Sequence, residues 1–229
     1  MALPGSLWPF IALALMVFAL FVAERRFPDA VTRFEEGVLA VLLALITLVS
    51  FGQVVARYGF NAGWGGALEF TRILFAWMIL FGMSYAVKIN AHLGVDVFVR
   101  MLPKRWFRIV AVFGALSGVF YAVILLYGDW LQIFGTSARG GAVDYWSKMF
   151  RIGIGLEDLR YPGFMQSLFG LQERVHRWAA YLILPVGLSL FAYRCAQAAI
   201  DIARGRRELV IASHEAEDLV AENKDILKD

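Results

Sequence analysis

The sequence has few of the residues that enzymes and metalloproteins use for their chemistry. Its single cysteine, Cys195, excludes an internal disulfide and any metal site built from several cysteines. Its three histidines, His92, His176 and His214, fall outside the predicted membrane spans, which argues against a haem-carrying electron carrier. The chain also lacks an HExxH motif, a Walker loop and a GxSxG motif. The sequence therefore offers no candidate for a catalytic, cofactor-binding or metal-binding residue.

Charge is scarce as well, and hydrophobic residues are abundant. Only 18% of the 229 residues are charged, whereas roughly 25% is typical of a soluble domain. Hydrophobic residues make up 60% of the chain in long uninterrupted runs, and the mean hydropathy is +0.64. The net charge of +3 is small and the basic residues are dispersed, so no nucleic-acid partner is expected. This composition is typical of an integral membrane protein in contact with a lipid bilayer.

The hydrophobic runs predict transmembrane helices. A bilayer core of about 30 Å needs roughly 20 apolar residues in a helix, because lipid offers backbone groups no hydrogen-bond partners. Four segments meet this requirement: 38–56, 67–87, 109–127 and 178–200. Pro185 predicts a kink in the last of them. A fifth stretch, 7–23, is shorter but carries no charge, and its arginines follow it rather than precede it as in a signal peptide.

The lysines and arginines of the short connections predict the orientation of the chain. The connections 24–36 and 88–108 are rich in basic residues, as are the residues after the last span, whereas 57–66 contains only one. Basic connections face the cytoplasm. The C-terminus is therefore expected in the cytoplasm, and the N-terminus in the periplasm if 7–23 crosses the membrane.

These elements define an all-α integral membrane protein with four core transmembrane helices and an extra N-terminal span. An interfacial cytoplasmic helix and a long periplasmic loop, about 128–177, complete the predicted fold. The aromatic residues of that loop predict a short helix or two resting on the membrane surface. Residues 1–33 form the N-terminal hydrophobic segment and connector, 34–203 the transmembrane domain, and 204–229 an acidic cytoplasmic tail.

The predicted spans contain little of the chemistry that moves a substrate across a membrane. Transporters usually place polar or ionisable groups near mid-membrane, but the second main span offers only Ser84 and the third only Ser117. Glu69 and Arg72 lie in the first turns of the span 67–87. They either pair at i, i+3 while reaching toward the lipid headgroups, or form an ion pair buried against a partner subunit. The chain is therefore predicted to be an accessory protein.

Small residues predict close helix packing in two of the spans. Gly114 and Gly118 form a GxxxG motif, and Gly82 and Ala86 form a similar pair. Small residues spaced in this way let two helices approach closely in a membrane, where hydrophobicity provides no drive between them. The sequence leaves open whether these faces pack within the chain or against a partner.

One region carries a more specific pattern than any of these. It comprises QVVARYGF (53–60), ALEFTRILFAWMILFGMSYAVK (67–88) and AHLGVDVFVRMLPKRW (91–106). The positions that carry the pattern are Arg57 with Tyr58, Glu69, Trp77, Gly82, His92 with Asp96, and Leu102 with Pro103. This region resembles the small membrane subunit, DctQ type, of the tripartite ATP-independent periplasmic (TRAP) transporters. The last span is also similar to the fourth span of that family.

The resemblance implies a division of labour among three proteins. In such systems a soluble periplasmic solute-binding receptor captures an organic acid, and a large membrane subunit moves it inward, driven by an ion gradient, usually of sodium. The small subunit lies in the bacterial inner membrane, supports the large one and carries no cofactor. The extra segment 7–23 and the long outer loop resemble variants found in C4-dicarboxylate systems. Two other functions stay open: a membrane anchor or small membrane enzyme subunit, and a stand-alone channel.

The connection after the second main span carries a polar stripe. His92, Asp96 and Arg100 recur at intervals of four, so on a helix they share one face. The stripe either lies in water at the inner membrane interface or contacts the large subunit. Unchanged uptake by a His92→Ala/Asp96→Ala double variant at equal expression would leave only the first alternative.

We expect the N-terminus to lie in the periplasm, because the uncharged segment 7–23 is followed by Arg25 and Arg26. Alkaline phosphatase, which is active only in the periplasm, should be active when fused before Met1 and inactive when fused after Asp229. A reporter that works only in the cytoplasm and is active at Met1 would reduce the number of spans to four.

Overall fold

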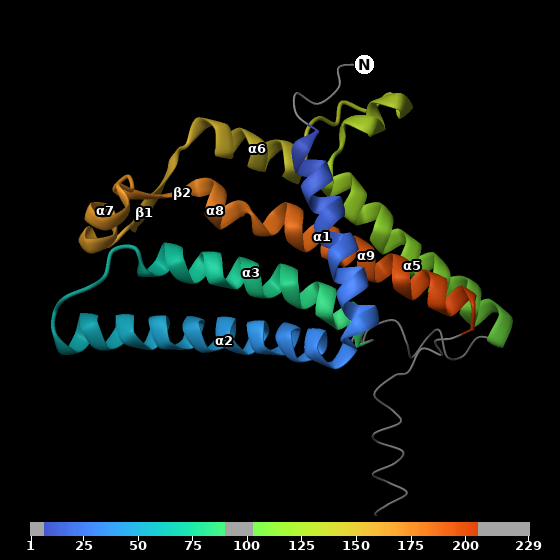
Figure 1. Ribbon diagram of the computed structural model, residues 1–229, viewed down its shortest axis with the longest axis horizontal. Coiled ribbons are helices and arrows are strands. Elements are labelled where there is room, and N and C mark those ends of the chain that lie inside the picture. The colour runs from blue at the N-terminus through green and yellow to red at the C-terminus, as the bar shows by residue number, and fades with distance from the viewer. Residues whose placement is uncertain (1–6, 90–102, 206–229) are drawn as a thin grey trace, which may run out of the picture.

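The computed structural model describes residues 7–89 and 103–205 of the chain (Figure 1). Its elements are α1 (Trp8–Arg26), α2 (Pro28–Gly59), α3 (Ala67–Lys88), α5 (Lys104–Leu126), η1 (Asp129–Phe134), α6 (Ala142–Ile152), β1 (Gly155–Arg160), α7 (Gly163–Phe169), β2 (Arg174–His176), α8 (Arg177–Tyr181) and α9 (Ile183–Ala203). Five helical segments within the described ranges are long and apolar enough to cross a membrane. The prediction of an all-α integral membrane protein with four core helices and an additional N-terminal one is confirmed.

Helix α2 differs most from its predicted span. It begins at Pro28 rather than at residue 38, and its 32 residues make it about 48 Å long at 1.5 Å per residue. Proline suits the first turn of a helix, because its fixed φ is helical and its missing N–H has no partner there anyway. The helix therefore extends beyond a hydrocarbon core of about 30 Å, and the extension carries the charged residues between 29 and 36.

The last span is interrupted where its proline predicts. Helix α8 ends at Tyr181, Leu182 is a turn, and α9 begins at Ile183. Pro185 has no N–H to donate to the carbonyl of Tyr181, and its ring crowds that carbonyl, so the helix cannot continue without a break. The ring itself is fully buried against neighbouring helices. The predicted kink is confirmed.

The long loop between α5 and α8 contains more than the predicted short helices. It holds η1, α6 and α7, and also an antiparallel hairpin in which β1 pairs with β2. The hairpin register places Gly155 opposite His176 and Arg160 opposite Arg174. The expectation of a short helix or two is correct for α6 and α7 but missed the hairpin. The sequence of β1, GLEDLR, does not alternate apolar and polar residues, and β2 has only three residues.

Helix α9 occupies the centre of the bundle. Figure 1 shows it between α3 and α5, with α2 on the far side of α3 and α1 crossing the other helices at an angle. A cluster of apolar side chains joins α3, α5 and α9: Val87, Ala122, Phe191, Cys195 and Ala198. Two glycines permit the close approach. A Cβ at Gly118 would lie 2.8 Å from Sγ of Cys195, and one at Gly187 would lie 2.8 Å from Cβ of Leu80.

The two predicted small-residue pairs have different surroundings. Gly118 packs within the chain, whereas a Cβ added at Gly114 would meet no atom within 4 Å. At Gly82 a Cβ would make an ordinary contact of 3.6 Å with Leu39 of α2. Within the described chain, the GxxxG motif therefore has one glycine at a helix contact and one on an open face.

We expect Gly118→Ala to lower the free energy of unfolding of the purified chain by about 1–2 kcal/mol, because the new methyl group would overlap Cys195. Gly114→Ala is the matched control. It should be neutral or raise the free energy of unfolding by up to about 1 kcal/mol, since alanine favours a helix more than glycine does. Reversible unfolding in mixed micelles measures both, and equal effects would contradict the packing described.

Candidate functional site: a buried ionic cluster and a held outer loop

Four charged side chains meet at the end of the bundle where α1 turns into α2. Arg194 of α9 forms ion pairs with Glu24 of α1 and Glu35 of α2. Lys88 of α3 pairs with Glu35, and its Nζ lies 3.6 Å from Oε1 of Glu24. The side chain of Arg194 is only 3% exposed and that of Glu35 only 7%. We call these four residues the ionic cluster. It joins four helices through two acidic and two basic groups.

Uncharged groups complete the hydrogen bonding of the ionic cluster. Tyr193 donates its hydroxyl to Oε2 of Glu24 at 3.0 Å, and the amide of Gln197 donates to the same oxygen at 3.3 Å. Lys88 also donates to the hydroxyl of Thr32 at 2.9 Å. Nε of Arg194 is buried and has no hydrogen-bond partner among the described residues. A buried charge is tolerated only when it is paired and hydrogen-bonded. The other charged atoms of the ionic cluster meet that condition.

The ionic cluster is one of two contacts that hold α1. Only Pro9 of this helix is buried, so apolar packing along its length contributes little. At its first turn, the ring of Trp8 packs edge-on against Trp146 of α6 at 5.4 Å, and Phe10 packs against Tyr127 at 5.6 Å. At its last turn, Glu24 enters the ionic cluster. Helix α1 is therefore fixed at both ends, by aromatic contacts at one and by ion pairs at the other.

Sequence reasoning missed this cluster. It treated the spans as almost free of ionisable groups, yet Arg194 lies near the middle of α9. The signal was present, because an arginine inside an apolar span is costly and implies a buried partner. Its partners could not be named from the sequence, since Glu24 and Glu35 lie 170 and 159 residues away along the chain.

A second polar contact holds the long loop between α5 and α8 to the bundle. The carboxylate of Glu69, in the first turn of α3, accepts hydrogen bonds from the backbone N–H groups of Glu157 (3.3 Å), Asp158 (2.8 Å) and Leu159 (2.7 Å) in β1. The described structure contains no ion pair between Glu69 and Arg72, on which both sequence-based alternatives depended. Glu69 instead joins α3 to the hairpin.

The other predicted site residues are dispersed. Nε1 of Trp77 donates to the carbonyl oxygen of Ala180 at 3.2 Å, which joins α3 to α8 beside the break in the last span. Arg57 lies at the end of α2 beside a polar cavity. His92, Asp96 and Arg100 lie outside the described residues. Among the predicted residues that the structure describes, none lie together in one site.

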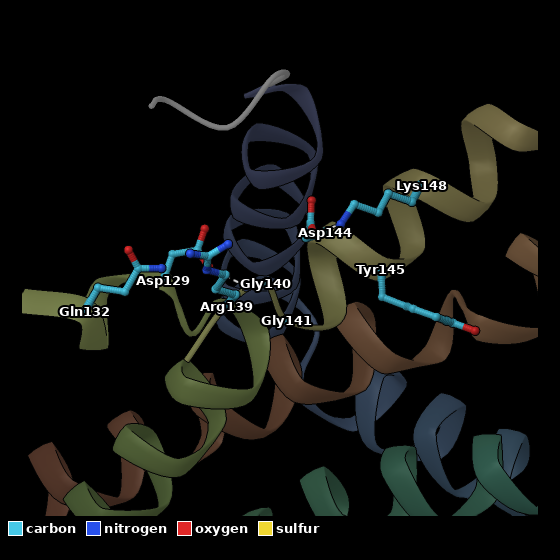
Figure 2. Close-up of a pocket in the computed structure, with 8 residues that line it drawn as sticks. All are labelled: Asp129, Gln132, Arg139, Gly140, Gly141, Asp144, Tyr145 and Lys148. Atoms are coloured by element: carbon cyan, nitrogen blue, oxygen red, sulfur yellow. Dashed lines mark hydrogen bonds and ion pairs between the residues drawn. The ribbon is translucent and has the colours of Figure 1, made fainter. Parts of the chain in front are cut away.

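A shallow polar cavity lies at the outer-loop end, between η1 and α6 (Figure 2). It has a volume of about 440 Å³ and contains both acidic and basic side chains. Asp129 accepts a hydrogen bond from the N–H of Gly140, which closes the loop. Asp144 forms an ion pair with Lys148 at 2.6 Å, one turn along α6. Asp129 therefore holds the loop together, whereas Asp144 pairs within α6. Among the described residues, no group of three or more His, Cys, Asp or Glu could hold a metal ion.

The fold and these contacts define a multi-pass membrane protein in which an ionic cluster joins four helices and the carboxylate of Glu69 joins the loop to α3. Residues 46–156 match the family model for tripartite ATP-independent periplasmic transporters, DctQ component. The chain is 31% identical over 201 residues to a C4-dicarboxylate TRAP transporter small permease protein DctQ of Vibrio cholerae. The alignment covers 84% of this chain and 80% of the relative. It is 30% identical over 213 residues to the protein of the same name from Pseudomonas aeruginosa. That alignment covers 81% of this chain and 90% of the relative.

The chain therefore belongs to the DctQ family, the small permease component of TRAP transporters. The resemblance inferred from residues 53–106 is confirmed. The chain is an accessory permease subunit of a transporter and not an enzyme, so the alternative of a membrane enzyme subunit is dropped.

We expect Arg194→Gln to lower the free energy of unfolding by about 3–5 kcal/mol, because it leaves the carboxylates of Glu24 and Glu35 with Lys88 as their only cationic partner. Helix α1 should then detach, and trypsin should cleave faster after Arg25 and Arg26. Arg204→Gln is the control, since it removes an exposed arginine from the end of the same helix. Equal stability and equal cleavage of the two variants would contradict the role given to the ionic cluster.

We expect Glu69→Gln to loosen the hairpin without unfolding the bundle, because a neutral amide is a weaker acceptor than a carboxylate. Hydrogen exchange at the amides of Asp158 and Leu159 should accelerate by about tenfold, for a loss of roughly 1.4 kcal/mol. Glu157→Gln, whose side chain is 82% exposed, is the matched control. Unchanged exchange in Glu69→Gln would show that the carboxylate does not hold the loop.

Proposed function

We propose that the chain supports the large membrane subunit of a TRAP-type secondary transporter for C4-dicarboxylates. A periplasmic solute-binding receptor delivers the substrate, and the large subunit moves it with an ion gradient, which we infer to be of sodium. The substrate class rests on the names of the relatives from Vibrio cholerae and Pseudomonas aeruginosa. The small subunit itself needs no cofactor for this role.

One observation supports the role of an accessory subunit: the buried charged groups described here pair with one another. Arg194 and Glu35 are the buried charged residues in the described part of the chain, and each is the other's partner. A pair that is satisfied within the chain stabilises the bundle and has no remaining charge to offer a dicarboxylate. The apolar surface, by contrast, is extensive. Phe51 of α2 and Phe113 of α5 are 67% and 70% exposed. Such faces suit lipid or the helices of a larger membrane subunit.

We infer that the ionic-cluster end of the bundle faces the cytoplasm of a bacterial inner membrane. Arg25, Arg26, Arg33 and Arg204 all lie at or near that end, as the positive-inside rule requires of the cytoplasmic side. The outer loop then lies in the periplasm. Because Trp8 contacts α6 in that loop, we infer that the start of α1 also lies on the periplasmic side. A cysteine introduced at Ser167 should be labelled from the periplasmic side. Labelling only from the cytoplasmic side would contradict this orientation.

We expect the chain to transport nothing by itself. Liposomes that contain it alone should take up no labelled C4-dicarboxylate under an inward sodium gradient. Liposomes that also contain the large subunit and the receptor should take it up. Omission of this chain from the three-protein mixture should abolish uptake, because the large subunit then lacks its support. Uptake by the chain alone would contradict the proposal and would favour a stand-alone channel or carrier.

A further inference from the structure

A polar cavity of about 610 Å³ lies between the end of α2 and the start of α3, at the same end of the bundle as the outer loop. Its polar lining comes from Ser50, Gln53, Arg57, Asn61, Trp64 and Thr71. Three of these side chains follow one face of α2, because their spacings of three and four residues match the helical repeat. The cavity is open. None of the contacts described above involves the side chains that line it.

Arg57 gives this cavity a positive charge. No aspartate or glutamate lines the cavity, and within the described residues Arg57 forms no ion pair. Gln53 lies one turn before it. Its Oε1 accepts a hydrogen bond from the backbone N–H of Trp64 at 3.1 Å, which leaves the amide Nε2 as a donor for a ligand. An unpaired guanidinium beside an amide donor suits a phosphate, which arginine binds with two parallel hydrogen bonds.

The surroundings of the cavity are those of a membrane interface. Tyr58, Phe60 and Trp64 are 82%, 77% and 46% exposed, and exposed aromatic rings gather at the headgroup level of a bilayer. The side of α2 toward mid-membrane is apolar, with Val54 and Phe51 both more than half exposed. A ligand that places a phosphate at Arg57 can therefore lay hydrocarbon chains along α2.

We propose that this cavity binds the phosphate of an anionic phospholipid, with Arg57 and Gln53 as its ligands and α2 in contact with the acyl chains. The adjoining apolar surface favours a lipid over a free phosphate ion. In the orientation inferred above, the lipid belongs to the outer leaflet. Binding of the lipid would keep the α2–α3 connection in place at the end of the bundle where the outer loop lies.

The test uses the full-length chain alone, so its result does not depend on the proposed transport role. The chain is purified, placed in nanodiscs of phosphatidylethanolamine with or without phosphatidylglycerol, and released into native mass spectrometry to count retained lipids. Arg57→Gln is compared with Arg57→Lys, which keeps the charge. Arg72→Gln is the matched control, because it removes an exposed arginine near the start of α3 that does not line the cavity.

We expect Arg57→Gln to weaken phosphatidylglycerol retention by about fivefold, the effect of roughly 1 kcal/mol for one basic residue at a membrane surface. Arg57→Lys keeps the charge but not the paired hydrogen bonds, so its loss should be smaller than that of Arg57→Gln. Arg72→Gln should stay near the unmodified chain. Photoactivatable phosphatidylglycerol should label residues between 50 and 71. Equal retention by all four proteins would overturn the proposal, as would equal losses in Arg57→Gln and Arg72→Gln. Displacement of the lipid by millimolar glycerol phosphate would also overturn it, because the site would then be one for free phosphate.

Discussion

The arrangement of this membrane subunit depends on one constraint: the guanidinium of Arg194 must find carboxylates inside an apolar bundle. An unpaired buried charge costs several kcal/mol, and Glu24 and Glu35 both pair with this one. Because these carboxylates belong to α1 and α2, their pairing fixes both helices against α9, and Lys88 adds α3 to the same point. The ionic cluster thus joins α1, α2, α3 and α9 at one end of the bundle.

The two ends of the bundle are held by different chemistry, and this suits a supporting subunit. Side-chain ion pairs join the helices at one end, whereas at the other Glu69 binds the backbone of the hairpin and aromatic rings hold α1. Contacts through backbone N–H groups depend little on the identity of the loop residues. The loop can therefore vary in sequence while its attachment persists. Between the two ends, exposed apolar faces of α2 and α5 remain for lipid or a partner.

The sequence was sufficient for features that depend on neighbouring residues. Span positions follow from local hydrophobicity, the break before Ile183 follows from Pro185, and the close approach at Gly118 follows from a small-residue motif. It was insufficient for contacts between distant segments. Nothing near Arg194 names Glu24 or Glu35 as its partners, and nothing near Glu69 reveals a hairpin some ninety residues later. Long-range polar pairing needs the three-dimensional arrangement that it helps to create.

Arg194 and Glu35 stabilise the bundle as a pair, and their coupling free energy can be measured. The measurement is a double-mutant cycle of Glu35→Gln, Arg194→Gln and the combined variant, by reversible unfolding in mixed micelles. Each single change leaves a net buried charge, whereas the double change leaves Glu24 with Lys88, 3.6 Å away and neutral together. We expect a coupling free energy of about 2 kcal/mol or more, with the double variant far less destabilised than the sum of the single ones. Strict additivity would contradict it.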